Sequence, residues 1–162
     1  MKARDIMTAN PACCRPSDTA RDAAKLMESR DCGCVPVVSD EGSRHLVGVV
    51  TDRDLALRGL AHDMGPDTPL EDLMSFDVSC CHPDDDVREI ERIMMERQVR
   101  RVPVVDDERR VVGIVAQADL AVSEEAGTSA GEVGRVVERI SEPEDAVRDR
   151  GAVLHGEGRS GR

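Results

Sequence analysis

The sequence predicts a mixed α/β (α+β) protein made of two similar β-α-β-β-α units, and three observations lead to that prediction. Short motifs recur at a nearly constant spacing along the chain. Inside each copy, runs of β-branched residues alternate with segments of helical periodicity. The length of 162 residues suits one domain or two small repeated ones.

The repeat is visible in two pairs of motifs. Asp5-Ile6-Met7 recurs as Asp72-Leu73-Met74, and Val35-Pro36-Val37-Val38 recurs as Val102-Pro103-Val104-Val105. The offset then falls from 67 to 65 residues within the polar segment 39–45. Because hairpin tips tolerate changes in length, this position supports the alignment of the two copies.

The first half of each copy is predicted to be a short strand followed by a helix. In the first copy the strand is expected around Ala12–Cys14, before Pro16. Thr19 and Asp22 have the spacing of two residues that cap a helix reciprocally. Asp86 and Glu89 are the corresponding pair in the second copy, and both helices keep an apolar face.

The second half of each copy is predicted to be a hairpin followed by another helix. Val35–Val38 and Leu46–Val50 are apolar runs joined by a polar turn, as in two antiparallel strands. The next helix is expected to begin near Thr51 and to end near Gly59, since glycine commonly ends a helix.

These patterns also set the expected boundaries. The first unit is expected at residues 2–60, a linker containing Gly65-Pro66 at 61–67, and the second unit at 68–122. Residues 123–162 are expected to be a flexible tail with one amphipathic helix near 131–140.

Composition excludes several classes of function. A net charge of -11 and an aromatic content limited to one Phe argue against nucleic-acid binding, which relies on cations and base stacking. No apolar run approaches the length of a membrane helix, and no catalytic motif is recognisable. We therefore expect a cytoplasmic protein with reduced thiols that is not an enzyme.

The repeated motifs resemble the CBS domain, present in tandem as in a Bateman module. The resemblance extends to small stand-alone CBS-pair proteins of the hypoxic-response type. The matching segments are Asp5–Thr8, Val35–Val38 and Gly48–Leu55 in the first copy, and Asp72–Met74, Arg100–Val105 and Gly113–Leu120 in the second.

The resemblance implies both a fold and a function. The two units would pack about a pseudo-twofold axis, with clefts between them that hold adenosyl ligands such as AMP, ATP or S-adenosylmethionine. Such modules are regulatory, require no cofactor and usually form homodimers. Because no catalytic domain is attached, the signal would pass to a separate protein partner, whose identity the sequence does not give.

In the first cleft, the resemblance assigns ligand-binding roles to several positions. Thr51 marks a helix start whose free N–H groups suit phosphate, Asp54 would accept hydrogen bonds from a ribose, and Arg53 would reach a phosphate. The other implied contacts are Val35 and Pro36 as an apolar wall, together with Ala12 and Cys34. Thr51 and Asp54 are equally consistent with a plain capping box.

The second cleft departs from the pattern. Ala116 stands where the first copy has a threonine, whereas Asp119 is retained. Arg101, with Arg100 before it, adds positive charge near the Val102-Pro103 turn, although a solvated strand edge explains these arginines equally well. The two clefts are therefore expected to be unequal, with the Thr51/Asp54 cleft filled first.

The cysteines support an alternative function. Cys13-Cys14 and Cys80-Cys81 occupy matching positions and are candidate redox residues, with any disulfide joining different segments or subunits. The alternative is a redox- or metal-responsive homodimeric stress protein with vestigial nucleotide clefts. The simpler interpretation is that these cysteines are small hydrophobic residues of the core.

Overall fold

The computed structural model describes residues 1–122 together with Gly134, Val137 and Glu138. Those last three residues are helical, and the rest of the tail helix predicted near 131–140 lies outside the described residues. Within the described part of the chain, no helix is both long enough and apolar enough to cross a bilayer.

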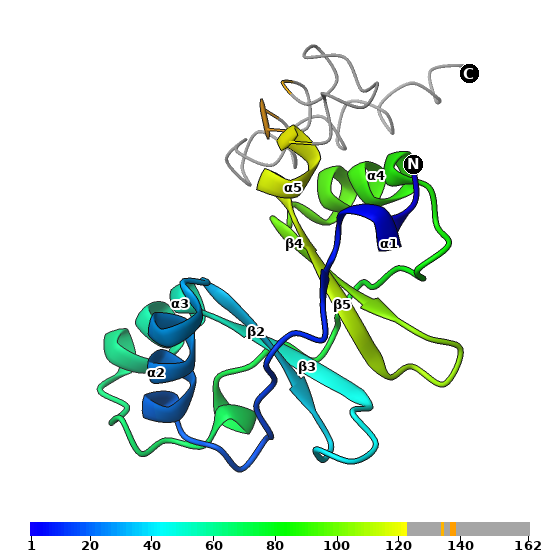
Figure 1. Ribbon diagram of the computed structural model, residues 1–162. Coiled ribbons are helices and arrows are strands. Elements are labelled where there is room, and N and C mark those ends of the chain that lie inside the picture. Colours follow the sequence, from blue (N-terminus) through cyan, green and yellow to red (C-terminus); the bar gives the residue numbers. More distant parts are fainter. Residues whose placement is uncertain (123–133, 135–136, 139–162) are drawn as a thin grey trace, which may run out of the picture.

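The first unit contains one long helix and one hairpin (Figure 1). Helix α2, Ala20–Arg30, precedes strands β2, Cys34–Val38, and β3, Leu46–Thr51, which pair antiparallel. Helix α3, Asp52–Asp54, continues into the π-helical turn η1, Leu55–Gly59. The 3₁₀ turn η2, Leu60–His62, then leads into the linker.

The second unit repeats this order. It begins with the 3₁₀ turn η3, Leu70–Asp72, and continues with helix α4, Val87–Arg97. Strands β4, Arg101–Val105, and β5, Val111–Ala116, pair antiparallel, and helix α5, Gln117–Val122, follows. The α+β class and the repeated architecture are thus confirmed.

The N-terminal segment lies on the second unit rather than on the first (Figure 1). It consists of helix α1, Ala3–Ile6, and strand β1, Thr8–Ala9, which pairs antiparallel with β5. Ala3 is fully buried in the core of the second unit, and its N–H donates to the Asp85 carbonyl at 2.9 Å.

The first unit receives the corresponding segment of the second. Leu70 and Met74 are buried in the core of the first unit, and Ser75 pairs with Val49 through two backbone hydrogen bonds of 2.9 and 3.0 Å. Each unit therefore completes its core with a segment that precedes the other unit in the sequence. The core of the first unit therefore includes residues that lie outside the segment 10–69.

The first strand predicted for each unit is reduced to a single bridge. Cys14 bridges Val37 in parallel, and the equivalent Cys81 bridges Val104. Prolines 11 and 16 flank the segment in the first unit, and because proline has no N–H it cannot extend a ladder of backbone hydrogen bonds. The prediction of a strand over Ala12–Cys14 was therefore wrong.

The predicted caps are confirmed in one helix and half-confirmed in the other. The Thr19 N–H donates to Asp22 Oδ2 at 2.9 Å, and the Asp22 N–H donates to Thr19 Oγ1 at 3.2 Å. Asp86 caps α4 by accepting from the Arg88 N–H at 3.0 Å. The reciprocal bond expected from Glu89 is absent from the cap of α4, because the Glu89 carboxylate pairs with Arg92.

A small apolar cluster joins the two units. Val38 and Leu46 from the first unit pack with Val105 and Val111 from the second, and all four are buried. The Leu46 N–H donates to the Arg109 carbonyl at 3.0 Å, and the Val111 N–H donates to the Arg44 carbonyl at 2.9 Å. These two bonds join equivalent positions reciprocally, as a pseudo-twofold axis between the units requires.

Candidate functional site

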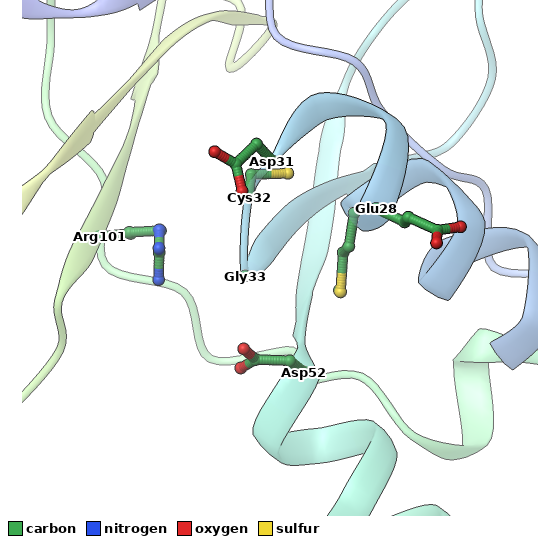
Figure 2. Close-up of a pocket in the computed structure, with 7 residues that line it drawn as sticks. Glu28, Asp31, Cys32, Gly33, Asp52 and Arg101 are labelled. Carbon is green, nitrogen blue, oxygen red and sulfur yellow. The ribbon is translucent and has the colours of Figure 1, made fainter.

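A cavity of about 470 Å³ lies between the two units, at the carboxyl end of α2 and the beginning of β2 (Figure 2). This volume falls within the range of small-molecule sites. Six of the lining residues come from the first unit, and Arg101 faces them from β4 of the second. The lining consists of Met27, Glu28, Asp31, Cys32, Gly33, Asp52 and Arg101.

Local backbone geometry explains why these residues meet. Asp31 ends α2 in the left-handed conformation, at φ 49°, and turns the chain toward β2. The Asp52 N–H donates to the Gly33 carbonyl at 3.1 Å, which holds the start of α3 against this turn. A Cβ on Gly33 would lie 2.7 Å from Asp52 Oδ2, so glycine is what permits the close approach of this carboxylate.

Thr51 and Asp54 form a complete capping box beside the cavity. Asp54 Oδ2 accepts from the Thr51 N–H at 2.9 Å and from Thr51 Oγ1 at 2.7 Å, while the Asp54 N–H donates to Thr51 Oγ1 at 3.1 Å. Arg58 adds an ion pair at 3.5 Å from Asp54 Oδ1. The carboxylate is 16% exposed and held in one orientation, yet it keeps lone pairs that can accept from a ligand.

The N–H groups at this helix start are not free. Asp52 N–H bonds to Gly33, Arg53 N–H donates to Asp52 Oδ1 at 2.8 Å, and Asp54 N–H bonds to Thr51. The N–H groups that we expected to be open to a phosphate are therefore already bonded within the chain. A phosphate at this position would need cationic side chains instead.

The other predicted contacts of the first cleft are not in the lining of the cavity. Val35 and Cys34 are buried at the start of β2, and Pro36 is the next residue of that strand. Ala12 is half-buried, and Arg53 is exposed on α3. Among the predicted ligand-binding residues, Arg101 is the one that lines the cavity.

The second unit has a simpler arrangement at the equivalent position. The Ala116 N–H donates to Asp119 Oδ2 at 2.7 Å, and the Gln117 N–H donates to the Arg100 carbonyl at 2.8 Å. Without a hydroxyl at residue 116, Asp119 makes half of the cap that Asp54 makes. Val102 and Pro103 are buried in β4, as their counterparts are in β2.

Sequence reasoning missed the acidic side chains of the cavity. Glu28, Asp31 and Asp52 belong to two elements that are separated by a hairpin, and each has an ordinary explanation as a surface, helix-end or first-turn residue. The internal repeat carried the one signal that could have identified these three residues. The equivalent residues of the second unit are uncharged, so the two copies differ in charge at these positions.

Four of the six cysteines lack the properties of a thiol switch. All six are free, and Cys14, Cys34 and Cys81 are buried. Burial raises the pKa of each of these three thiols to about 12. The pKa of Cys13 is also raised by burial, although Arg44 Nη2 lies 3.5 Å from its sulfur and acts in the opposite direction. Such thiols stay protonated and are poor nucleophiles at neutral pH.

Cys80 is half-buried and packs beside the same central cluster as Cys13. Among the described residues, no group of three or more His, Cys, Asp or Glu side chains is placed to hold a metal ion. The metal-responsive alternative therefore finds no ligand set in this part of the chain.

Comparison with known sequences identifies the family. The model of the CBS domain matches residues 3–59 and 70–123, so the chain belongs to the CBS-domain family as a tandem pair. It is 38% identical over 128 residues to the CBS domain-containing protein YhcV of Bacillus subtilis, covering 79% of this chain and 89% of that protein. Hypoxic response protein 1 of Mycobacterium tuberculosis is 38% identical over 120 residues, covering 74% and 82%.

Solved structures agree with this assignment. Hypoxic Response Protein I, with two coordinated zinc ions, has a TM-score of 0.68 at 36% identity and covers 75% of this chain and 98% of its own. The CBS domain pair of protein MJ0100, in complex with 5′-methylthioadenosine and S-adenosyl-L-methionine, has a TM-score of 0.70 at 30% identity, covering 79% and 98%. CBSX2 in complex with AMP has a TM-score of 0.65 at 26% identity, covering 77% and 96%.

Enzymes also occur among the relatives, but the match covers a small part of them. A homoserine O-acetyltransferase of Methanocorpusculum labreanum is 33% identical over 124 residues, which is 76% of this chain and 24% of that enzyme. The shared region is therefore a module that such enzymes carry in addition to most of their length.

Proposed function

We propose that this protein is a regulatory module that binds an adenosyl ligand between its two CBS units and transmits the occupancy to a protein partner. The observation that carries the proposal is the cavity of about 470 Å³ whose walls come from both units. Relatives of the same fold hold adenosyl ligands, which supports the ligand class. The module itself performs no catalysis in this proposal.

The construction of the fold supplies a route for the signal. A ligand in the cavity would contact α2 and α3 on one side and Arg101 on the other. Binding would therefore change the orientation of the two units relative to each other. Each unit also contains the buried segment that precedes the other one, which links their cores mechanically. A partner that recognises one arrangement of the units would thereby sense the ligand.

We further propose that the module is a homodimer. An apolar groove of about 480 Å³ lies between α2 and the turns η1 and η2, and Leu60 in its lining is 76% exposed. Leu57, on the turn η1, is 48% exposed. Exposed aliphatic side chains around such a groove are typical of an interface. A second copy of the chain offers the same groove and the same leucines, as a twofold contact requires. The cytoplasm is the proposed compartment because all six thiols are free.

Two measurements test this function. Calorimetric titration of the full chain with AMP, ATP, 5′-methylthioadenosine and S-adenosylmethionine is expected to give saturable binding to at least one of them. If none binds at millimolar concentration, the sensing function is wrong. Sedimentation at micromolar concentration is expected to give a dimer that Leu60→Asp converts to a monomer, and a monomeric parent protein would exclude the homodimer.

A further inference from the structure

The Arg58 side chain joins the start of α3 to the segment that precedes the second unit. Arg58 Nε lies 3.5 Å from Asp54 Oδ1. On its other side, Arg58 Nη1 donates to the backbone carbonyls of Leu73 and Met74, at 3.0 Å each. One guanidinium group therefore contacts a carboxylate beside the cavity and two carbonyls of the segment 70–75 at the same time.

The turn that carries Arg58 differs between the two units. Leu55–Gly59 form the π-helical turn η1, whereas the equivalent helix of the second unit, α5, is α-helical over Gln117–Val122. π-Helical turns are rare and are frequently found at functional sites. The residue of the second copy that aligns with Arg58 is Ser123, so the sequence places an arginine at this position in the first unit alone.

The segment that Arg58 contacts leads directly into the second unit. Leu73 is fully buried and Met74 is 4% exposed, so this backbone is held against the first unit. A few residues later, Val78 and Cys80 pack against the apolar cluster that joins the two units. A displacement of the carbonyls at residues 73 and 74 would therefore reach this cluster through a short stretch of chain.

From this placement we infer that Arg58 couples the occupancy of the cavity to the segment 73–80, as a positioning residue that acts through Asp54. A ligand hydroxyl that donates to Asp54 would compete with Arg58 for the lone pairs of this carboxylate. Because the same guanidinium is bonded to two backbone carbonyls, the change would be transmitted to that backbone. This inference rests on the proposed function and deepens it by naming the residue that carries the signal between the units.

The single phenylalanine of the chain provides a reporter for this segment. Phe76 is 63% exposed and lies two residues after Met74. The chain contains no Trp and no Tyr, so Phe76→Trp introduces one emitter beside the contacted carbonyls. The full chain with Phe76→Trp is titrated separately with AMP and with S-adenosylmethionine, and calorimetry checks that the reporter leaves the affinity of the parent unchanged. Saturation with at least one of the two ligands is expected to change the emission.

Arg58→Gln tests the coupling in this reporter background. It removes the cation but leaves the capping box of Thr51 and Asp54 intact. The affinity is expected to fall about threefold or less, whereas the emission change at saturation is expected to fall by about half or more. Arg58→Lys keeps the charge but lacks the forked donor, so it should restore the affinity and only part of the emission change. Arg92→Gln is the matched control, because the ion pairs of Arg92 lie within α4.

A double-mutant cycle tests whether Arg58 acts through Asp54. Residues that act through one another have non-additive effects. Adding Arg58→Gln to Asp54→Asn is therefore expected to leave the affinity and the emission change within about twofold of those of Asp54→Asn alone. Losses that multiply would show that the two residues act independently, and this part of the inference would be wrong.

The outcomes separate the coupling from the proposed function. If a ligand binds but the emission of Phe76→Trp does not respond, or responds equally in Arg58→Gln and the parent, the coupling is wrong and the sensing function stands. A loss of unfolding free energy in Arg58→Gln with an unchanged emission response would assign Arg58 to the stability of the fold and also contradict the coupling. If neither AMP nor S-adenosylmethionine binds at millimolar concentration, the sensing function fails, and the coupling fails with it.

Discussion

The two CBS units of this protein share a backbone and differ in charge at equivalent positions. The buried Val-Pro strands, the left-handed helix ends and the exchanged segments recur from one unit to the other. The charges beside the cavity do not, because Glu28, Asp31 and Asp52 have uncharged counterparts in the second unit. A repeated scaffold can therefore keep its packing fixed while the charges on its surface diverge.

The largest expected effect concerns the exchanged segments, and it distinguishes the two units. A Cβ on Gly48 would lie 2.8 Å from the Ser75 backbone oxygen, which a strand pairing holds in place. A Cβ on the equivalent Gly113 would instead meet the Met7 side chain, which is able to turn aside. Gly48→Ala is expected to lower the free energy of unfolding by about 3 kcal/mol and Gly113→Ala by about 1 kcal/mol.

Chemical denaturation of both variants measures this difference. A larger loss at Gly113 than at Gly48 would show that the N-terminal segment, rather than residues 70–75, is the more tightly held of the two.

The next effect compares Asp54 and Asp119, the carboxylates that occupy equivalent positions in the two copies of the repeat. Asp54→Asn keeps an oxygen for the Thr51 N–H but replaces a charged acceptor with an amide. Losing a charged hydrogen bond corresponds to about tenfold or more in affinity. We therefore expect Asp54→Asn to weaken adenosyl-ligand binding about tenfold, and Asp119→Asn to weaken it less, because Asp54 lies beside the cavity that Asp52 lines. Calorimetric titration measures both affinities, and equal effects of the two variants would contradict a ligand site beside Asp54.

These comparisons also mark what the sequence could predict. Features that depend on neighbours along the chain were accessible, such as the Thr19/Asp22 and Thr51/Asp54 caps and the paired β-branched strands. The exchange of residues 2–9 and 70–75 between units was not, because it depends on contacts between distant segments. For the same reason the acidic cavity was missed, since Asp31 and Asp52 meet only after the hairpin has formed.

A smaller effect concerns the caps of α3 and α5. Thr51→Ala removes the oxygen that accepts from the Asp54 N–H and is expected to cost about 1 kcal/mol of unfolding free energy. Ala116→Thr introduces the missing hydroxyl beside Asp119 and is expected to raise stability by up to about 1 kcal/mol. Thermal denaturation of the two variants tests the predicted loss of stability in Thr51→Ala and the predicted gain in Ala116→Thr. A loss of stability in Ala116→Thr would show that the second unit has no room for this cap.

The smallest difference between the units is expected in the pH dependence of stability, because each unit has one equivalent buried thiol, Cys14 or Cys81. Burial raises the pKa of Cys14 and Cys81 to about 12 from an unfolded value near 9.0. Above pH 9 the unfolded chain loses these protons and the native chain keeps them, so stability should fall as pH rises from about 9 toward 12. Cys14→Ala and Cys81→Ala should flatten this slope equally in denaturation curves. A steeper fall of stability with pH in either variant would contradict the assignment of this slope to the raised pKa values of Cys14 and Cys81.

The location of a bound adenosyl ligand tests the central claim most directly. A crystal structure of the full chain with such a ligand is expected to show it in the cavity between the units, in contact with Asp52 of the first unit and Arg101 of the second. A ligand bound elsewhere on the chain, with this cavity empty, would contradict the proposed function.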